Sequence, residues 1–496
     1  RRFGVGLIHR CGVTPPAGPV PVEQGWDCPQ PRIALYLHNR VEYLEAMVGA
    51  MMARAVPVNV NYRYRSEELR YLFDDAAVDA IVYETRFAPA VADVLDDLDR
   101  PPSLIHVVDT SGETPLPGST DIEEVIAGAS AADLEPIARR RTADDRYILY
   151  TGGTTGMPKG VLWRQGDWLA SALGVDPSGD SEAEALDALA ERARRREHRI
   201  LAAPPFMHGA AHWNGFSFML AGGTVLIQDD PTSLDPADIV DTAERERATA
   251  LLVVGDAFAR PIVDELRRRP RDLSSLRHLF SSGAQLSQDT KQALLDLLPQ
   301  IRIHDVLGSS ESGRQATELT SNEGTEVHSG RFEVEETAPV LDESLTRVLD
   351  TGDRSMGWLA KTGRVPTGYL GDPDKTAATF PVIDGVRYSV PGDRARYRDD
   401  GGIELHGRDS VTINTGGEKV FAEEVEHVLK AHPAVFDAVV APRPSEHWGQ
   451  EVAAVVELRS GVEVTDEDLR DHTKRHLAGY KAPRTIVRVA AVQRSP

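Results

Sequence analysis

Short apolar runs alternate with amphipathic, helix-length segments from Ile33 to Ile303. Apolar positions three and four residues apart predict helices at residues 41–54 and 67–75, and the runs between such segments predict buried strands. The expected strands lie at residues 33–37, 56–60, 80–83, 104–108, 222–227, 250–254, 276–280 and 301–303. Regular alternation of strands and helices is typical of βαβ units. The pattern therefore predicts an α/β fold with mostly parallel sheets.

The pattern of apolar and polar residues changes toward the C-terminus. After about residue 315, short apolar stretches separated by glycines indicate a β-rich piece, and a compact α+β pattern begins after residue 410. The elements expected there are a helix at 422–430, strands at 435–441 and 451–458, and a helix at 465–476. A length of 496 residues allows roughly three folding units. We expect an N-terminal body over residues 1–406, a hinge at 407–410 and a small C-terminal domain over 411–496.

Residues 1–31 do not follow this pattern. Prolines crowd residues 14–21 and recur at residues 29–31, and proline supports neither a helix interior nor a central strand. We assign no element to this segment from sequence.

Charge and composition narrow the class of protein. Lys and Arg total 55 and Asp and Glu total 77, and a net charge of −22 argues against a general nucleic-acid binder. Arginines end a predicted helix at 181–199; we interpret them as a solvated face, with a phosphate-binding patch as the alternative. The sequence has no apolar run of membrane-spanning length, no secretory signal pattern and only two cysteines. We expect a cytoplasmic protein without a transmembrane segment.

A glycine-rich segment follows a predicted strand at residues 147–150. It combines glycines, hydroxyl side chains and one lysine: Thr151, Gly152, Gly153, Thr154, Thr155, Gly156 and Lys159. Glycines let backbone N–H groups approach an anion, and the hydroxyls and lysine add donors and charge. Pro158 and Gly160 flank the lysine, so this is not a P-loop. The segment predicts a phosphate cradle; a plain surface turn is the alternative.

Residues 150–161 resemble the signature loop of the adenylate-forming superfamily, which includes acyl-CoA synthetases and peptide-synthetase adenylation domains. Further segments resemble family motifs in the family's order, at residues 205–209, 282–287, 305–311, 368–373, 389–393 and 407–426. The resemblance covers residues 33–496. It implies an N-terminal adenylation domain of two αβα lobes plus a distorted β-barrel, followed by a mobile α+β domain.

The resemblance also implies a reaction. A carboxylic acid would be activated by ATP to an acyl-adenylate and then transferred to coenzyme A, releasing pyrophosphate and AMP. It implies catalytic roles for Lys159, His208, Ser310 and Glu311, with Glu311 as the Mg²⁺ ligand. Besides the glycine-rich segment, it implies that nucleotide is contacted by Gly283, Ala284, Asp305, Leu307, Gly308, Ser309, Asp393, Arg408, Gly416, Gly417 and Lys419.

The apolar residues around His208 suggest the substrate class. An acyl pocket is expected from Phe206, Met207, His212, Trp213 and Phe216. Residues 413–426 look most like those of fatty-acyl-CoA synthetases and of enzymes acting on sterol side-chain acids. His208 and His212 have the spacing of a helical metal pair, but the sequence lacks the Glu of the H-E-x-x-H motif, so a metal hydrolase is only an alternative.

Two departures from the family pattern leave other functions open. Leu307 stands where an aromatic residue usually stacks on adenine, and the family's C-terminal catalytic lysine does not occur before Pro496. We expect the natural protein to continue beyond that point. The alternatives are an acyl-AMP ligase that loads a carrier protein and a non-catalytic nucleotide- or acyl-binding homologue. A homodimer is possible.

Overall fold

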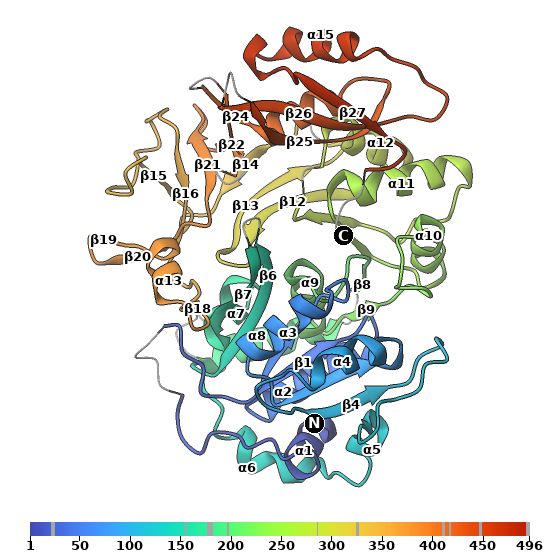
Figure 1. Ribbon diagram of the computed structural model, residues 1–496, viewed down its shortest axis with the longest axis vertical. Helices are drawn as coiled ribbons and strands as arrows, with labels where there is room; N and C mark the ends of the chain where they lie inside the picture. The colour runs from blue at the N-terminus through green and yellow to red at the C-terminus, as the bar shows by residue number, and fades with distance from the viewer. Residues whose placement is uncertain are drawn as a thin grey trace.

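In the computed structural model the chain folds into stacked tiers, seen from bottom to top in Figure 1. The described residues are 1–20, 25–153, 156–175, 182–195, 198–284, 286–323, 327–408, 412–415, 418–445 and 449–492. A small parallel sheet lies in the lowest tier, a large mixed sheet crosses the middle, and the C-terminal residues form the top. The α/β class expected from the apolar pattern is confirmed.

The first sheet is parallel throughout. Its strands are, in spatial order, β2 (Val56–Asn59), β1 (Arg32–Tyr36), β3 (Ala80–Glu84), β4 (Ser103–Val107) and β5 (Thr120–Asp121). The surrounding helices are α2 (Val41–Met52), α3 (Ser66–Asp75), α4 (Ala88–Leu95) and α5 (Ile122–Ile126), with a 3₁₀ turn at Thr85–Phe87. Ile33 and Leu35 pack into one hydrophobic cluster and Ala34 and Tyr36 into another, so β1 is buried on both faces. That burial explains the uninterrupted apolar runs.

The N-terminal segment, to which the sequence assigned no element, contains a helix. This helix, α1 (Arg2–His9), packs on α2 and α5. A Cβ added to Gly6 would lie 2.1 Å from the Val125 carbonyl oxygen, so glycine allows this close packing. Short helical segments at Ala131–Leu134 and Glu135–Ala138 (α6) lie close by. The proline-rich residues that follow α1 form no helix or strand among those described.

The middle tier is an eleven-stranded sheet. Its parallel part runs β9 (Thr224–Leu226), β8 (Arg199–Ala202), β10 (Ala250–Val253), β11 (His278–Ser282) and β12 (Arg302–Ser309). Antiparallel strands extend it through β13 (Gly313–Thr320), β14 (Arg331–Val334), β22 (Ile403–Arg408), β21 (Asp393–Tyr397), β16 (Gly357–Leu359) and β15 (Val340–Leu341). The β-rich piece expected after residue 315 is therefore hydrogen-bonded to the second lobe. Strand β13 pairs with β12, and β14 pairs with β13 and β22, so the β-rich piece and the parallel strands form one sheet. Such pairing between segments distant in sequence is not visible in a local pattern.

Helices cover this sheet on both faces. They are α10 (Pro236–Arg245), α11 (Gly255–Arg268) and α12 (Gln288–Leu297) on one face, and α9 (Gly209–Leu220) on the other, with α7 (Gln165–Ser171) and α8 (Glu182–Arg195) before β8. Smaller sheets complete the body: β6 (Arg146–Gly153), β7 (Gly156–Arg164) and β18 (Gly368–Tyr369), and β17 (Lys361–Thr362), β20 (Val386–Ser389) and β19 (Val382–Ile383), with α13 (Pro373–Thr379).

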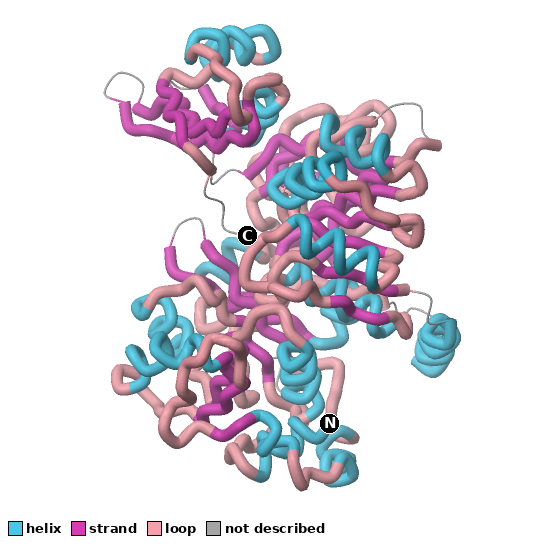
Figure 2. The backbone as a smooth tube through the Cα atoms, turned by 90° about the vertical axis from the view of Figure 1, so that its right-hand side faces the viewer, coloured by secondary structure: helices cyan, strands magenta, loops and turns pink. Residues whose placement is uncertain are grey.

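The C-terminal unit has its own sheet and core. Its strands are β24 (Glu418–Phe421), β23 (Thr412–Thr415), β26 (Gly449–Leu458), β25 (Val435–Ser445) and β27 (Thr485–Val489), with α14 (Ala422–Lys430), α15 (Asp466–His476) and a 3₁₀ turn at Gly479–Lys481. Figure 2 shows it as a distinct body at the top. Of the expected hinge at residues 407–410, residues 407 and 408 end β22, and residues 409 and 410 lie outside the described residues.

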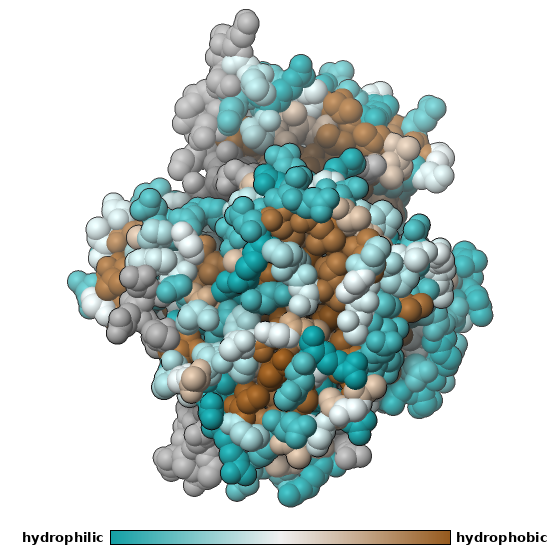
Figure 3. All heavy atoms as spheres, turned by 60° about the horizontal axis from the view of Figure 1, so that its bottom comes forward, coloured by the Kyte–Doolittle hydropathy of each residue, from teal (hydrophilic) through white to brown (hydrophobic). Residues whose placement is uncertain are grey.

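The surface is mixed in character. Figure 3 shows apolar patches that come to the surface among hydrophilic residues on one face of the molecule. Over the described residues, no helix combines the length and hydropathy needed to cross a bilayer.

Candidate active site

The predicted phosphate cradle is a β-hairpin. Strands β6 and β7 are antiparallel, and their register places Thr151 opposite Lys159. Gly152, Gly153 and Gly156 lie in these strands, while Thr154 and Thr155 lie outside the described residues. The Lys159 ammonium is 3.5 Å from the Asp372 carboxylate, and both side chains are partly exposed. Ion pairs of this kind contribute little, so the lysine can leave this one for a phosphate.

Glu311 sits in the turn between β12 and β13, next to this hairpin. The Tyr369 hydroxyl donates to Glu311 Oε1 at 2.9 Å, and the Ser389 hydroxyl donates to the Glu311 carbonyl at 2.6 Å. Trp163 of β7 donates its indole N–H to the Ser310 carbonyl at 2.9 Å. The turn is therefore fixed by residues from three other strands. Tyr369 lies in a motif that the sequence identified, but the sequence alone did not reveal its contact with Glu311.

His208 ends the turn that leads into α9. Asn59, which ends β2, donates to the Tyr150 carbonyl at 2.8 Å and to the Met207 carbonyl at 2.7 Å, and accepts from the Tyr150 N–H at 2.7 Å. One buried amide therefore joins the residue before Thr151 to the residue before His208. Sequence analysis missed Asn59, because a lone asparagine after a strand carries no signal of such a link.

The expected acyl-pocket residues cluster around α9. Phe206, Met207 and His212 are almost fully buried. His212 donates through Nδ1 to the Phe206 carbonyl at 2.6 Å, and its Nε2 accepts from the Tyr147 hydroxyl at 2.6 Å. Tyr147 in turn accepts from the Trp213 indole at 2.8 Å. Phe216 stands edge-on to both His212 and Trp168.

These bonds bear on the alternative of a metal site. Both ring nitrogens of His212 are engaged within the protein, which leaves no lone pair for a metal ion. In the described part of the chain, no three His, Cys, Asp or Glu side chains are grouped as metal ligands would be. His212 is therefore not available to bind a metal ion together with His208, and the place of these residues in the wall of an acyl pocket stays a prediction.

Burial lowers the pKa of His212 from 6.5 to about 4 and gives a pH prediction. Between pH 4 and pH 6.5 the His212 imidazole binds a proton in the unfolded chain but not in the folded protein. The contribution of neutral His212 to the free energy of unfolding is complete above pH 6.5 and is lost as the pH falls toward 4. Lowering the pH from 7 to 5 should therefore reduce the free energy of unfolding by about 2 kcal/mol through this residue. Urea unfolding at both pH values should show a smaller loss for His212→Gln than for the native protein. Equal losses would contradict the prediction.

The nucleotide-side residues gather at one edge of the large sheet. Gly283 and Ala284 follow β11, and Leu307, Gly308 and Ser309 end the adjacent parallel strand β12. Gly283 has φ +84°, a left-handed conformation that glycine adopts without strain. A Cβ on Gly308 would lie 2.3 Å from the Gly313 carbonyl oxygen, so this glycine is also needed for packing between β12 and β13.

Asp305 is held inside the protein. The fully buried Lys291 ammonium lies 3.0 Å from the Asp305 carboxylate and 2.8 Å from that of Glu318. Burial raises the pKa of Asp305 to about 6. The carboxylate thus already has a partner, and the predicted contact of Asp305 with adenine remains a prediction. A lysine within an amphipathic helix gave no sign that it would be buried.

The remaining predicted contacts lie toward the C-terminal unit. Asp393 begins β21 and is paired in register with Arg408 of β22. Asp393 is buried. It lies four residues after Ser389, whose hydroxyl donates to the Glu311 carbonyl. Lys419 lies in β24, whereas Gly416 and Gly417 lie outside the described residues.

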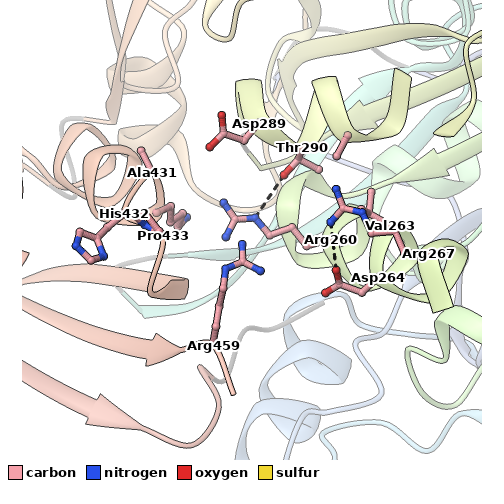
Figure 4. A pocket seen from close by; sticks show the side chains of 12 residues that line it. Arg260, Val263, Asp264, Arg267, Asp289, Thr290, Ala431, His432, Pro433 and Arg459 are labelled. Atoms are coloured by element: carbon pink, nitrogen blue, oxygen red, sulfur yellow. Dashed lines mark hydrogen bonds and ion pairs between the residues drawn. The ribbon is translucent and has the colours of Figure 1, made fainter. Parts of the chain in front are cut away.

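A cleft of about 160 Å³ lies apart from these residues, between the C-terminal unit and helices α11 and α12 (Figure 4). Arg260 projects across it, donates to the Phe436 carbonyl and pairs with Asp256 at 3.1 Å. None of the residues predicted for catalysis or nucleotide binding lines this cleft. Arg260 there links the C-terminal unit to the body.

Comparisons with known proteins identify the family. Residues 28–358 match the family model described as AMP-binding enzyme, and residues 424–496 match the AMP-binding enzyme C-terminal domain. The chain is 46% identical over 474 residues to medium-chain acyl-CoA ligase Mig of Mycobacterium avium, covering 95% of this chain and 85% of that protein. It is 38% identical over 484 residues to a 3-oxocholest-4-en-26-oate–CoA ligase of Rhodococcus rhodochrous, covering 96% and 86%.

A solved structure supports the fold. ATP-bound MatB from Rhodopseudomonas palustris superposes with a TM-score of 0.77 at 23% identity, covering 100% of this chain and 89% of that one. At this level of identity the likeness concerns the fold alone.

Proposed function

The chain belongs to the AMP-binding enzyme family, and on that premise we propose that it converts a medium-chain fatty acid or a sterol side-chain acid into its coenzyme A thioester. The identity to named CoA ligases over nearly the whole chain supports this reaction. The single structural observation that carries the proposal is the meeting of the Lys159 hairpin with the Glu311 turn, where Tyr369 contacts both side chains.

In the first step a carboxylate oxygen of the acid attacks the α-phosphorus of ATP. The bond from that phosphorus to the bridging oxygen breaks, and pyrophosphate leaves with the bond's electron pair. Such a step needs positioning and charge neutralisation more than covalent help. We assign Lys159 and Thr151 to the departing phosphates, Ser310 to the α-phosphate and His208 to the acid carboxylate.

The residues present fit a magnesium ion. Mg²⁺ is commonly bound by one or two carboxylates together with substrate phosphates and water. Tyr369 donates to one oxygen of Glu311, which leaves its other oxygen able to face a cation. Glu311 would hold the ion, which when bound would offset negative charge on the phosphates. Tyr369 and Ser389 keep the turn in place.

In the second step the thiol sulfur of coenzyme A, as thiolate, attacks the acyl carbon, and AMP leaves as the C–O bond breaks. We propose that the C-terminal unit, residues 411–496, turns about residues 407–410 between the steps. The C-terminal unit has a hydrophobic core of its own, which supports its movement as one body. Strand β22, before the hinge, belongs to the large sheet, and β23, after it, belongs to the C-terminal sheet. Reduced thiols persist in the cytoplasm, which is the compartment we propose.

The test is CoA-dependent release of AMP from ATP, measured over alkanoic, aromatic and sterol side-chain acids. We expect AMP with medium-chain or sterol acids only when CoA is present. Acid-dependent pyrophosphate release with acyl-adenylate accumulation, and no CoA dependence, would instead identify an acyl-AMP ligase. Nucleotide binding without turnover of any acid would overturn the enzymatic proposal in favour of a binding homologue.

A further inference from the structure

An arginine of the body reaches across to the C-terminal unit. Arg260 of α11 projects into the cleft between the two bodies (Figure 4), and its guanidinium donates to the carbonyl of Phe436 in β25. The arginine is only 9% exposed, and the two residues are 176 positions apart in sequence. Arg260 is not among the residues predicted for catalysis, nucleotide binding or the acyl pocket, so the steps described above give it no role.

A β-bulge explains why the Phe436 carbonyl can receive this bond. The β25–β26 ladder shifts register between Val435 and Asp437, and Phe436 lies at the shift. The extra residue of a bulge is left unpaired in its ladder. The carbonyl of Phe436 can therefore accept from outside the C-terminal sheet, and the Arg260 guanidinium is a donor that reaches it.

A closed set of hydrogen bonds fixes the direction of the guanidinium. Asp256, one turn earlier on α11, pairs with Arg260 at 3.1 Å and accepts from the Ser287 N–H and hydroxyl at 2.9 and 3.0 Å. The hydroxyls of Ser287 and Thr290 are 2.9 Å apart, and Thr290 accepts from Arg260 Nε at 3.4 Å (Figure 4). All four side chains are buried. We call these four residues the Arg260 ring.

The Arg260 ring adjoins the nucleotide edge of the large sheet. Ser287 ends the motif at residues 282–287, which contains predicted nucleotide contacts. Lys291 follows Thr290 on α12, and its ammonium lies 3.0 Å from the carboxylate of Asp305. The ring therefore lies between the residues predicted to contact adenine and the attachment point of the C-terminal unit.

The rest of this interface is not packed like a protein core. A cleft of about 160 Å³ remains between the two bodies, and its lining includes four basic residues and two acidic ones: Arg260, Arg267, Lys430 and Arg459, with Asp264 and Asp289. Domains move relative to one another unless their interface is large and hydrophobic. The bond from Arg260 to Phe436 is therefore a specific attachment that the C-terminal unit can make and break.

On the basis of the proposed function, we propose that Arg260 is a positioning residue that couples the nucleotide edge to the C-terminal unit. An intact Arg260 ring aims the guanidinium at the Phe436 carbonyl and holds the unit in one of the two positions that acyl-adenylate formation and thioester formation use. When the unit turns, this bond breaks. Arg260 touches no substrate, and it sets how the C-terminal unit divides its time between the two steps.

The first test measures the two half-reactions separately with decanoic acid. Single-turnover pyrophosphate release without CoA reports the first, and AMP release after CoA is added to the acyl-adenylate complex reports the second. Arg260→Met should lower one of the two rate constants about ten-fold, the population change expected when one charge-assisted hydrogen bond is lost, and leave the other unchanged or raised. Arg260→Lys, which keeps a donor, should recover part of the loss.

Three further variants separate the causes. Arg260→Met leaves the Asp256 carboxylate without its partner, so Arg260→Met combined with Asp256→Asn, which keeps an acceptor for Ser287, removes that cost. Ser287→Ala should lower the same rate constant by a smaller factor. Arg267→Met is the matched control, because Arg267 lines the same cleft from α11 but its acidic neighbour at 3.8 Å, Asp264, lies on its own helix. The control should change neither rate constant more than two-fold.

The second test measures the position of the C-terminal unit directly. Nitroxide labels at Arg302→Cys in β12 and Lys474→Cys in α15, both exposed positions, report the separation of the two bodies by pulsed electron paramagnetic resonance. Cys11→Ser removes the partly exposed native thiol, and Cys28 is buried. With MgATP the native enzyme should show a population at the separation seen in the structure, and Arg260→Met should reduce that population about ten-fold relative to the others.

Several outcomes would overturn the proposal. Equal losses in both half-reactions would do so, as would no loss in either or an unchanged distribution of label separations. Melting temperatures show whether Arg260→Met is folded, and the double variant decides where it is not. A silent Ser287→Ala beside an active Arg260→Met would overturn the link to the nucleotide edge. If the native enzyme forms neither acyl-adenylate nor CoA thioester from any acid, the proposed function itself fails, and the label separations still decide whether Arg260 positions the C-terminal unit.

Discussion

Replacing Arg54 with methionine should lower the free energy of unfolding by about 3–5 kcal/mol. Arg54 and Asp145 form a two-bond ion pair, at 2.7 and 3.1 Å, and neither side chain has any exposed surface. The same guanidinium donates to the carbonyls of Pro16 and Gly18, both at 2.9 Å. Methionine would leave a buried carboxylate and two carbonyls without these donors. Urea unfolding at neutral pH measures the effect.

A double variant separates the causes. Arg54→Met with Asp145→Leu removes the unpaired carboxylate, and should recover at least half of the loss, because a buried pair replaced by apolar residues is often tolerated. Arg54 has φ +58°, and methionine meets the same backbone strain, so strain does not enter the comparison. A double variant as unstable as the single one would show that the carboxylate is not the cause.

Replacing Glu311 with glutamine should reduce acid-dependent AMP formation about 10²- to 10³-fold, the loss typical when one charge-stabilising group is removed from an active site. Glutamine keeps an acceptor for Tyr369 and nearly the same shape, but it lacks the charge that a cation requires. The variant should melt at the native temperature. Single-turnover pyrophosphate release over a range of Mg²⁺ concentrations measures the effect.

Two controls define the role of Glu311. Glu135→Gln removes the same charge from an exposed pair between Glu135 of α6 and Arg139 just after it, in the lowest tier of the molecule (Figure 1), and should be silent. Tyr369→Phe removes only the hydrogen bond that orients Glu311, and should lose less than Glu311→Gln. Native activity in Glu311→Gln would remove Glu311 from the mechanism.

The sequence was sufficient for the fold class because burial on both faces leaves a local record. Strand β1 places alternate residues in two different cores, and only a continuous apolar run can satisfy both. Helices α2, α3, α14 and α15 begin within a residue of the predicted positions, because their apolar spacing is also local. The helix at Arg2–His9 escaped notice, since glycines at positions 4 and 6 obscure its apolar face and are explained only by close contact with neighbouring segments.

The sequence by itself thus determined an α/β enzyme with adenylate-forming motifs, including the hairpin lysine and the turn glutamate. Only the tertiary structure decided which side chains meet: Tyr369 with Glu311, 58 residues away, and Asn59 with Met207, 148 residues away. It also decided that Lys291 engages Asp305 and that His278 pairs with His304. Periodicity records how a residue faces its own strand or helix, whereas a hydrogen bond between distant segments depends on how whole elements pack, which no local pattern encodes.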